Sequence, residues 1–232
     1  MNNEIGATQD IASLGAAVHQ VGGLMHVDAA QALSAIEMRV AQLPVDFVSL
    51  SSHKTYGPKG IGALYVAPSR MQLLRPLMYG GGQENGLRAG TLPTPLCVGF
   101  GAACAILRAH GDEERARIGK LRDQLLDLLR RIDARICLVG PTAHRHSGNL
   151  SIRLPVPDAR DVIQLLQGKM ACSTGSACHS GTELPSHVLL SIGLPVREAR
   201  QVLRLGIGRF TTHQDCERAA KILAAAVNAS SN

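Results

Sequence analysis

One lysine in this chain stands where an amine could react with a carbonyl group. The segment SSHKTYGPKGIGALYV, residues 51–66, places Lys54 directly after His53, between an apolar run and a glycine-rich stretch. Burial and a neighbouring cation would favour the neutral, nucleophilic form of such a lysine. Proteins hold pyridoxal phosphate (PLP) through a lysine of this kind. The alternative is an ordinary loop lysine.

A second segment supplies an acidic residue at the end of a short apolar strand. LMHVDAAQ, residues 24–31, predicts a strand that ends in Asp28, with Gln31 three residues further on. Ligands of open α/β sheets bind at the carboxyl ends of strands, and a pyridine ring acts as an electron sink when an anion keeps its nitrogen protonated. Asp28 is therefore a candidate partner of a pyridine nitrogen, and Gln31 could reach the phenolic oxygen. The alternative for Asp28 is a helix N-cap.

A third segment contains a candidate nucleophile. CSTGSACHSG, residues 172–181, surrounds Cys178 with small residues. A thiol in such a loop can move, stay accessible and lose its proton to a nearby cation. Cys172 is predicted to line the strand that leads into the loop, whereas Cys97 and Cys104 stand in apolar runs typical of structural cysteines. The 6 cysteines include no CxxC pair, which argues against a zinc knuckle or a disulfide framework.

The chain resembles a known family through the order of its motifs. NNEIG, HVDAAQ, SSHKTYGPKGIGALYV, GGGQENGLRAGT, STGSAC and LGIGRFTT follow one another along the sequence. In this order they resemble the cysteine desulfurases of the class V aminotransferase family, above all the housekeeping and nitrogen-fixation type. The resemblance runs from Asn2 to the last predicted helix, near Val227. It implies PLP as the cofactor, L-cysteine as the substrate, L-alanine as a product, and sulfur held as a persulfide on Cys178.

The resemblance also implies which residues hold the cofactor ring. Lys54 resembles the lysine that binds PLP covalently and serves as a catalytic base. Asp28 resembles the partner of the pyridine nitrogen. Gln31 and Asn3 resemble contacts of the ring, and Asn3 also resembles a substrate contact.

Further positions resemble phosphate and carboxylate ligands. Ser51 and His53 look like phosphate ligands, and Thr91 matches a threonine that reaches the phosphate bound by the other subunit of a homodimer. Arg204 matches the arginine that binds the substrate carboxylate. That role has an independent physical basis, because a guanidinium group binds a carboxylate through two parallel hydrogen bonds. The alternative for Arg204 is a surface salt bridge.

The expected partners follow from the same resemblance. We expect a homodimer that passes sulfur to an acceptor protein such as an iron–sulfur scaffold, where Cys178 would be a transient cluster ligand; no permanent metal is expected. Family members carry a long stretch before NNEIG that supplies the first strands of the large domain, so we expect an incomplete central sheet here. Two alternatives remain open: an inactive or split relative that acts as a binding partner, and another class V enzyme, such as an aminotransferase or a selenocysteine lyase.

Composition agrees with this interpretation without leading to it. The chain has 232 residues, 45% of them hydrophobic, which is enough for a substantial core. Its net charge of +6 could attract nucleic acid, but with no tryptophan and only 3 tyrosines and 3 phenylalanines there is little to stack on bases. No run of membrane-spanning length and no leader segment is recognised. Unpaired cysteines favour a cytoplasmic location.

The elements that must position these residues alternate between strand and helix. Helices are predicted over residues 10–21, 93–110, 112–131, 158–167 and 214–227; strands are predicted before residue 28 and over 46–51, 61–66, 148–154 and 202–207. This alternation is typical of an α/β protein with a mainly parallel sheet, here an incomplete PLP-dependent transferase fold of type I with a smaller C-terminal α+β domain. We predict domains at 1–112 and 113–227, and a disordered tail at 228–232.

Overall fold

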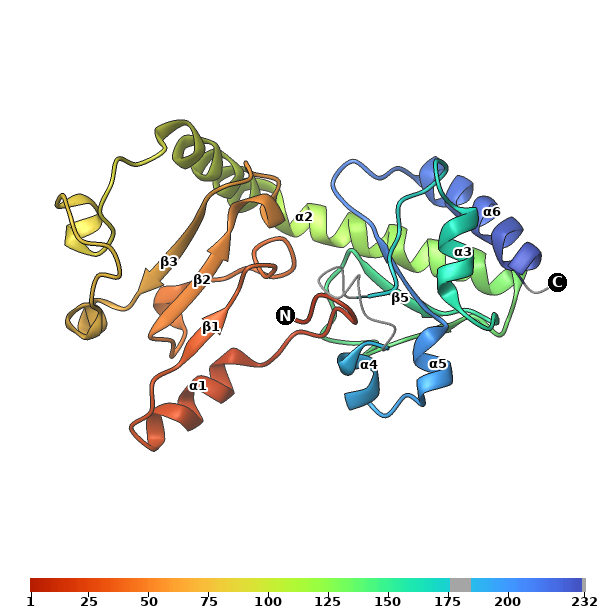
Figure 1. Cartoon of the computed structure of the whole chain (residues 1–232), viewed down its shortest axis with the longest axis horizontal. Coiled ribbons are helices and arrows are strands. Elements are labelled where there is room, and N and C mark those ends of the chain that lie inside the picture. Colours follow the sequence, from red (N-terminus) through yellow and green to blue (C-terminus); the bar gives the residue numbers. More distant parts are fainter. Residues whose placement is uncertain (176–184, 231–232) are drawn as a thin grey trace. The chain divides into compact units, whose positions relative to one another are not determined.

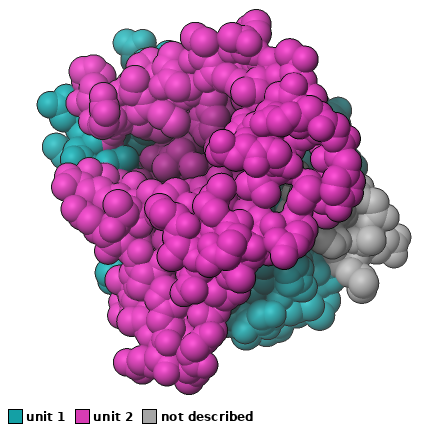
Figure 2. Space-filling view, turned by 90° about the vertical axis from the view of Figure 1, so that its left-hand side faces the viewer, with its two compact units in different colours: residues 1–8, 112–232 teal, residues 9–111 magenta. Residues whose placement is uncertain are grey.

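The computed structural model describes residues 1–175 and 185–230, and the chain divides into two compact units (Figures 1 and 2). The N-terminal unit contains residues 9–111, and the C-terminal unit contains residues 112–232 together with 1–8. The sequence placed a boundary between residues 112 and 113, whereas the division here lies between 111 and 112. It also placed residues 1–8 in the first domain, but they pack with the C-terminal unit.

The N-terminal unit is built on a three-stranded sheet in the order β1-β2-β3 (Figure 1). Its elements are α1 (Ile11–Gln20), β1 (His26–Asp28), η1 (Val40–Gln42), β2 (Phe47–Ser51), η2 (Ser52–Thr55), β3 (Gly62–Val66), η3 (Pro68–Leu73), η4 (Gln83–Gly86) and the first part of α2 (Thr94–Ile132). Strand β1 runs parallel to β2, and β3 runs antiparallel to β2. The sheet is therefore mixed, where a mainly parallel one was predicted, since the glycine-rich turn after β2 reverses the chain directly.

Alternating apolar residues explain how this sheet is held together. Val27 and Val48 are paired in the register of β1 and β2 and point to the same face, where both are buried. Ile11 of α1 and apolar residues of the connection before β2 pack on them. Asp10 caps the N-terminus of α1, where its side chain accepts a hydrogen bond from Ser13 N. The core therefore lies on the α1 side of the sheet.

The C-terminal unit contains an antiparallel sheet in the order β4-β5-β6. Its elements are the second part of α2, β4 (Cys137–Leu138), β5 (Asn149–Arg153), α3 (Ala159–Leu165), α4 (His187–Ser191), α5 (Val196–Arg200), β6 (Val202–Gly206) and α6 (His213–Ser230). Leu129 of α2, Leu150 of β5, Leu203 of β6 and Leu223 of α6 are at most 1% exposed. Burial of each such leucine contributes about 2 kcal/mol. They belong to a cluster of buried residues that is larger than the cluster in the N-terminal unit.

Three boundaries differ from the sequence prediction. Gly111 was expected to end a helix, but α2 continues through it from Thr94 to Ile132, because one buried glycine costs only about 1 kcal/mol in a long helix. The disordered tail predicted at 228–232 is wrong for residues 228–230, since α6 extends to Ser230; residues 231–232 lie outside the described residues. The helix predicted over 214–227 begins one residue earlier, at His213, where Thr212 and Asp215 form a reciprocal capping box, with Thr212 N donating to Asp215 and Asp215 N donating to Thr212 Oγ1.

Candidate active site

Lys54 lies in η2, a single 3-10 turn that directly follows β2. Ser52 and Thr55, on either side of it, are fully buried, and Thr55 Oγ1 donates to the Ser52 carbonyl over 2.7 Å. Tyr56 then adopts a left-handed conformation (φ 65°). A Cβ on Gly57 would lie 2.3 Å from Ser52 Oγ, so a larger residue there would displace the buried Ser52 side chain or the turn. The glycine-rich turn thus holds Lys54 in place through its buried neighbours.

Asp28 lies at the same edge of the sheet as the lysine turn. Because β1 and β2 are parallel, with Asp28 opposite Ser49, their carboxyl ends meet at one edge. Asp28 Oδ1 accepts a hydrogen bond from Ala30 N (2.9 Å), which bends the chain toward half-buried Gln31. Asp28 is exposed rather than buried, and it precedes a series of turns, so it does not cap a regular helix.

Ser51 and His53 lie beside the lysine as a pair of polar groups. Ser51 Oγ is 3.1 Å from His53 Nδ1, and the His53 side chain is exposed. The edge formed by β1 and β2 therefore carries a carboxylate, a hydroxyl, an imidazole and an amine. These are the group types that PLP needs for its pyridine nitrogen, its phosphate and its aldehyde, so the residues fit the cofactor.

The exposure of Lys54 differs from the sequence argument. That argument assigned the reactivity of the amine to burial, but Lys54 is exposed in the described part of the chain. The physical reason is the 3-10 turn, in which Ser52 and Thr55 take the inward positions and His53 and Lys54 point outward. Desolvation of the amine is therefore not provided by the described residues.

Arg204 and Asn3 form a second group, in the C-terminal unit. Arg204 lies in β6, paired with Ser151 of β5, and on its other side it exchanges two backbone hydrogen bonds with Ser173 (2.7 and 3.2 Å). Its Nη1 donates to the Asn3 carbonyl over 2.9 Å. No residue that the structure describes forms an ion pair with Arg204. The remaining guanidinium donors of Arg204 can bind a carboxylate.

Five of the cysteines lie in the described part of the chain, and the candidate nucleophile does not. Cys178 lies outside the described residues. Cys97, Cys104, Cys137, Cys172 and Cys216 are all free thiols. Cys172 packs against the core of the C-terminal unit, and burial raises the pKa values of Cys104, Cys172 and Cys216. Raised pKa values disfavour the thiolate, so these three are poor nucleophiles at neutral pH.

Thr91 stands apart from the other candidates. It is exposed, in the segment between η4 and α2, and its carbonyl lies 3.5 Å from Arg88 Nη1. No contact in this single chain tests its expected role toward a second subunit.

Within the described ranges, no group of three His, Cys, Asp or Glu residues could hold a metal ion. No described helix is long and apolar enough to cross a membrane.

Sequence reasoning missed two buried carboxylates. Asp46 is 2% exposed; its oxygens accept from Met25 N (2.7 Å) and Arg70 Nε (2.7 Å) and lie 2.8 Å from His19 Nε2. It joins α1, β1 and η3 and has a structural role. Glu4 is 3% exposed and directly follows Asn3. The position of Glu4 inside the NNEIG motif was the sequence feature that could have marked it as a candidate.

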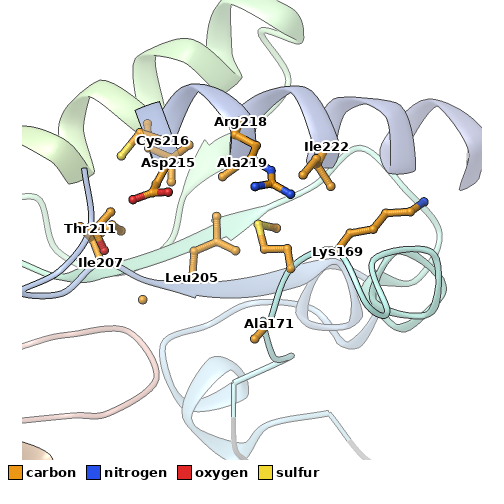
Figure 3. Close-up of a pocket in the computed structure, with 13 residues that line it drawn as sticks. Lys169, Ala171, Leu205, Ile207, Thr211, Asp215, Cys216, Arg218, Ala219 and Ile222 are labelled. Atoms are coloured by element: carbon orange, nitrogen blue, oxygen red, sulfur yellow. The ribbon is translucent and has the colours of Figure 1, made fainter. Parts of the chain in front are cut away.

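A pocket of about 290 Å³ lies between β6 and α6 of the C-terminal unit (Figure 3). Leu205, Ala219 and Ile222 form apolar walls, and the Arg218 guanidinium points into the space between them (Figure 3). Neither Asn3 nor Arg204 lines the pocket. The side chains of adjacent strand residues point to opposite faces of the sheet, so the side chains of Leu205 and Arg204 lie on opposite faces. The pocket is distinct from the groups described above.

The fold is that of the PLP-dependent transferases of fold type I, here incomplete, as predicted. The sequence profile of the family Aminotransferase class-V matches residues 1–219, and the chain belongs to this family. The cysteine desulfurase IscS of Tolumonas auensis is 43% identical over 223 residues, which cover 96% of this chain and 55% of that protein. The chain thus spans about half the length of the curated relatives it matches.

Solved structures agree with this assignment. A NifS-like protein superimposes with a TM-score of 0.87 at 29% identity, over 98% of this chain and 59% of that one. SspA, solved in complex with cysteine, superimposes with a TM-score of 0.69 at 33% identity, over 91% of this chain and 58% of that one. The predicted resemblance to cysteine desulfurases is confirmed, and these relatives are PLP-dependent.

Proposed function

We propose that this chain acts in a PLP-dependent cysteine desulfurase, which converts L-cysteine to L-alanine and holds the sulfur as a persulfide on Cys178. The observation that supports this most strongly is the position of Lys54 at the same sheet edge as Asp28, in a chain whose relatives are named cysteine desulfurases. The complex of the similar SspA with cysteine supports L-cysteine as the substrate.

The residues that would hold the cofactor come from the groups described above. Lys54 would bind it covalently, Asp28 would pair with the pyridine nitrogen, and Ser51 and His53 would bind the phosphate. The ring contacts proposed for Gln31 and Asn3, and the phosphate contact of Thr91 across a homodimer, complete the set. When bound, PLP supplies an electron sink for negative charge at the substrate α-carbon.

The remaining steps belong to three side chains of this chain. Arg204 binds the substrate carboxylate and fixes its orientation. The free Lys54 amine removes the proton from the α-carbon. The Cys178 thiolate attacks the substrate sulfur: a sulfur–sulfur bond forms, the carbon–sulfur bond breaks, and its electron pair stays on carbon, where protonation leads to alanine. No outside oxidant is needed.

The wider setting is part of the same proposal. The enzyme is a cytoplasmic homodimer that passes the persulfide sulfur to an acceptor protein, such as an iron–sulfur scaffold, on which Cys178 is a transient cluster ligand. The five free cysteines described here are consistent with a reducing compartment. The side chains of Lys54 and His53 are exposed, so the site is accessible to a small polar substrate.

One experiment tests the central claim. Purified protein is mixed with PLP and reduced with borohydride, and the modified lysine is located by peptide mass spectrometry. We expect label on Lys54 and its loss in Lys54→Ala, whereas Lys59→Ala, a control in the same segment, keeps it. L-Cysteine is then added to unreduced protein; Cys178 should gain one sulfur atom, and Cys178→Ser should release no alanine.

The outcome also separates the alternatives. Label on another lysine, or alanine production by Cys178→Ser, would refute the proposed mechanism. Amino transfer without persulfide would identify another class V enzyme. Failure to bind PLP at all would favour an inactive or split relative that acts as a binding partner.

A further inference from the structure

The pocket between β6 and α6 has no role in the proposed mechanism. Its volume is about 290 Å³, and all the residues that line it belong to the C-terminal unit (Figure 3). Neither Lys54 and Asp28, which would hold PLP, nor Arg204 lines it. Its own side chains indicate which kind of ligand it could bind.

Apolar side chains form the interior of the pocket. Leu125 of α2, Leu205 of β6 and Ile207 are at most 5% exposed and belong to the core cluster of this unit, so the pocket reaches down to the core. Contact with an apolar ligand would remove the remaining exposed surface from water, which favours binding. The side walls consist of partly buried residues that pack on the same cluster: Met170, Ala219 and Ile222.

The turn at one end of the pocket, which contains Thr211, is fixed by hydrogen bonds. Arg117 Nη1 of α2 donates to the Thr211 carbonyl over 2.9 Å, and Gly208 N donates to Thr211 Oγ1 over 3.0 Å. In the same turn, Arg209 forms an ion pair with Glu114 of α2 (2.6 Å). This end of the pocket is therefore preformed, and a ligand would not have to order it.

Among the described residues that line the pocket, three carry a charge, and two of these are cations. The Arg218 guanidinium points into the space between the apolar walls (Figure 3). The Lys169 ammonium donates to the Leu165 carbonyl over 3.3 Å and retains further donors. The third charged residue is Asp215, so the charge of the described lining is positive.

The Arg218 guanidinium is available to a ligand. No residue in the described ranges forms a hydrogen bond or an ion pair with it. Asp215 lies three residues earlier in α6, but its carboxylate accepts hydrogen bonds from Thr212 Oγ1 (2.7 Å) and Thr212 N (2.9 Å) instead. These bonds lower the pKa of Asp215, with a smaller effect of the Arg218 charge, so Asp215 is an anion at neutral pH and its main partner is Thr212.

We propose that this pocket binds a small monocarboxylate with an apolar body. The apolar body would lie between β6 and α6, and the carboxylate would accept hydrogen bonds from Arg218, whose parallel donors match its two oxygens. The two cations disfavour a positively charged ligand, and a neutral ligand would leave the guanidinium without an anionic partner. This site does not depend on the proposed desulfurase reaction, because Arg204 lies on the opposite face of the sheet.

Four probe compounds test the proposal. Hexanoate, hexan-1-ol and hexylammonium share one carbon skeleton and carry a negative, a neutral and a positive head group, and acetate carries the carboxylate without the apolar body. Each is titrated into the purified chain at neutral pH, and binding is followed through the amide resonances of 205–207 and 215–222 in ¹H–¹⁵N NMR spectra. No PLP and no L-cysteine are added, so failure here is distinguishable from failure of the proposed function.

We expect hexanoate to bind with a Kd on the order of 1 mM, as is reasonable for so small a ligand. The resonance shifts should be confined to amides around the pocket. Hexan-1-ol should bind at least about threefold more weakly, and hexylammonium and acetate at least about tenfold more weakly, because each lacks either the charge or the apolar body.

Three variants locate the site. Arg218→Gln removes the charge and should weaken hexanoate binding about fivefold, with little effect on hexan-1-ol. Ala219→Leu fills part of the pocket and should weaken the binding of both compounds. Arg130→Gln replaces an exposed arginine of α2 that does not line the pocket; it is the control and should bind hexanoate like wild type.

Several results would overturn the proposal. Hexan-1-ol or hexylammonium binding as tightly as hexanoate would show that charge does not select the ligand, and equal binding of acetate would show a surface anion site only. Hexanoate shifts outside the pocket, no measurable hexanoate binding, or wild-type binding by Arg218→Gln would refute it as well. If Ala219→Leu does not fold, Arg218→Gln and Arg130→Gln decide by themselves, since both arginines are exposed.

Discussion

The hydroxyl of Ser186 donates a hydrogen bond of 2.5 Å to the carboxylate of Glu4, across 182 positions of the chain. This contact places the first motif of the sequence in the C-terminal unit, beside the strand that carries Arg204. The neighbouring contacts agree: Thr8 N donates to the His144 carbonyl over 2.8 Å, and Asn149 donates to the Glu4 carbonyl. Residues 1–8 are therefore structural members of a unit that begins more than a hundred residues later.

The first prediction concerns the turn that holds Lys54. In Gly57→Ala the new Cβ would lie 2.3 Å from Ser52 Oγ, so the buried Ser52 side chain or the turn must shift. We expect a loss of about 1–3 kcal/mol in the free energy of unfolding, as for other overpacked sites, together with weaker labelling of Lys54 by PLP and borohydride. Urea denaturation and peptide mapping measure the two effects.

Gly101→Ala is the matched control for this variant. Nothing lies within 4 Å of its Cβ position in α2, and alanine is about 1 kcal/mol more favourable than glycine in a helix. We expect equal or greater stability and normal labelling. If Gly57→Ala behaved like Gly101→Ala, the glycine would not determine the position of Lys54.

The second prediction concerns Arg204. In Arg204→Lys one ammonium group replaces the planar guanidinium, so the two parallel bonds to a carboxylate are lost. We expect KM for L-cysteine to rise about tenfold or more, with a smaller change in kcat, since the group binds substrate in the ground state. Alanine formation is the assay. Arg160→Lys, in an exposed ion pair with Asp158, should leave both constants unchanged; an unchanged KM in Arg204→Lys would remove its assigned role.

The third prediction concerns the acid stability contributed by Asp46. Hydrogen bonds from Met25 N, His19 and Arg70 hold the pKa of Asp46 far below its ordinary value of 3.8. Its contribution to stability is therefore complete above about pH 4 and is lost as the pH falls toward the folded-state pKa.

Asp46→Asn should lower the free energy of unfolding at pH 7 by about 3 kcal/mol, because His19 and Arg70 lose a buried anionic partner. It should also weaken the loss of stability below pH 4. Urea denaturation across this pH range gives both quantities. Asp123→Asn, whose side chain is 62% exposed, is the control and should cost under about 1 kcal/mol.

The fourth prediction concerns His146, which donates its backbone N–H to the Gly6 carbonyl and accepts from Gly148 N at Nδ1. Burial, with a smaller effect of Arg122, lowers the pKa of His146 from 6.5 to about 4. Between these values the unfolded chain binds more protons than the folded one, so stability should fall as the pH drops from about 6.5 to 4.

The total loss from this residue should not exceed about 3 kcal/mol, the equivalent of the pKa difference. His146→Gln should flatten stability in this pH range, whereas His110→Gln, an exposed residue of α2, should not. A titration of the His146 ring followed by NMR, with a midpoint near 6.5 in the folded protein, would contradict the assignment.

Local features of the sequence were sufficient for much of the fold. The strands predicted over 46–51, 148–154 and 202–207 and the helices predicted over 10–21 and 158–167 lie close to the elements observed. The signals behind these predictions act between near neighbours in the chain, so they can be read without a structure. The order of the motifs likewise identified the family.

Contacts between distant residues could not be predicted in this way. The sequence by itself determined that an amine, a carboxylate, a guanidinium and a thiol belong to one kind of chemistry. Only the tertiary structure decided that Lys54 is exposed on its turn, that α2 continues through Gly111, and that Glu4 is buried against Gly175 and Ser186. The physical reason is that burial and long-range hydrogen bonds depend on which segments pack together, and no local pattern encodes that choice.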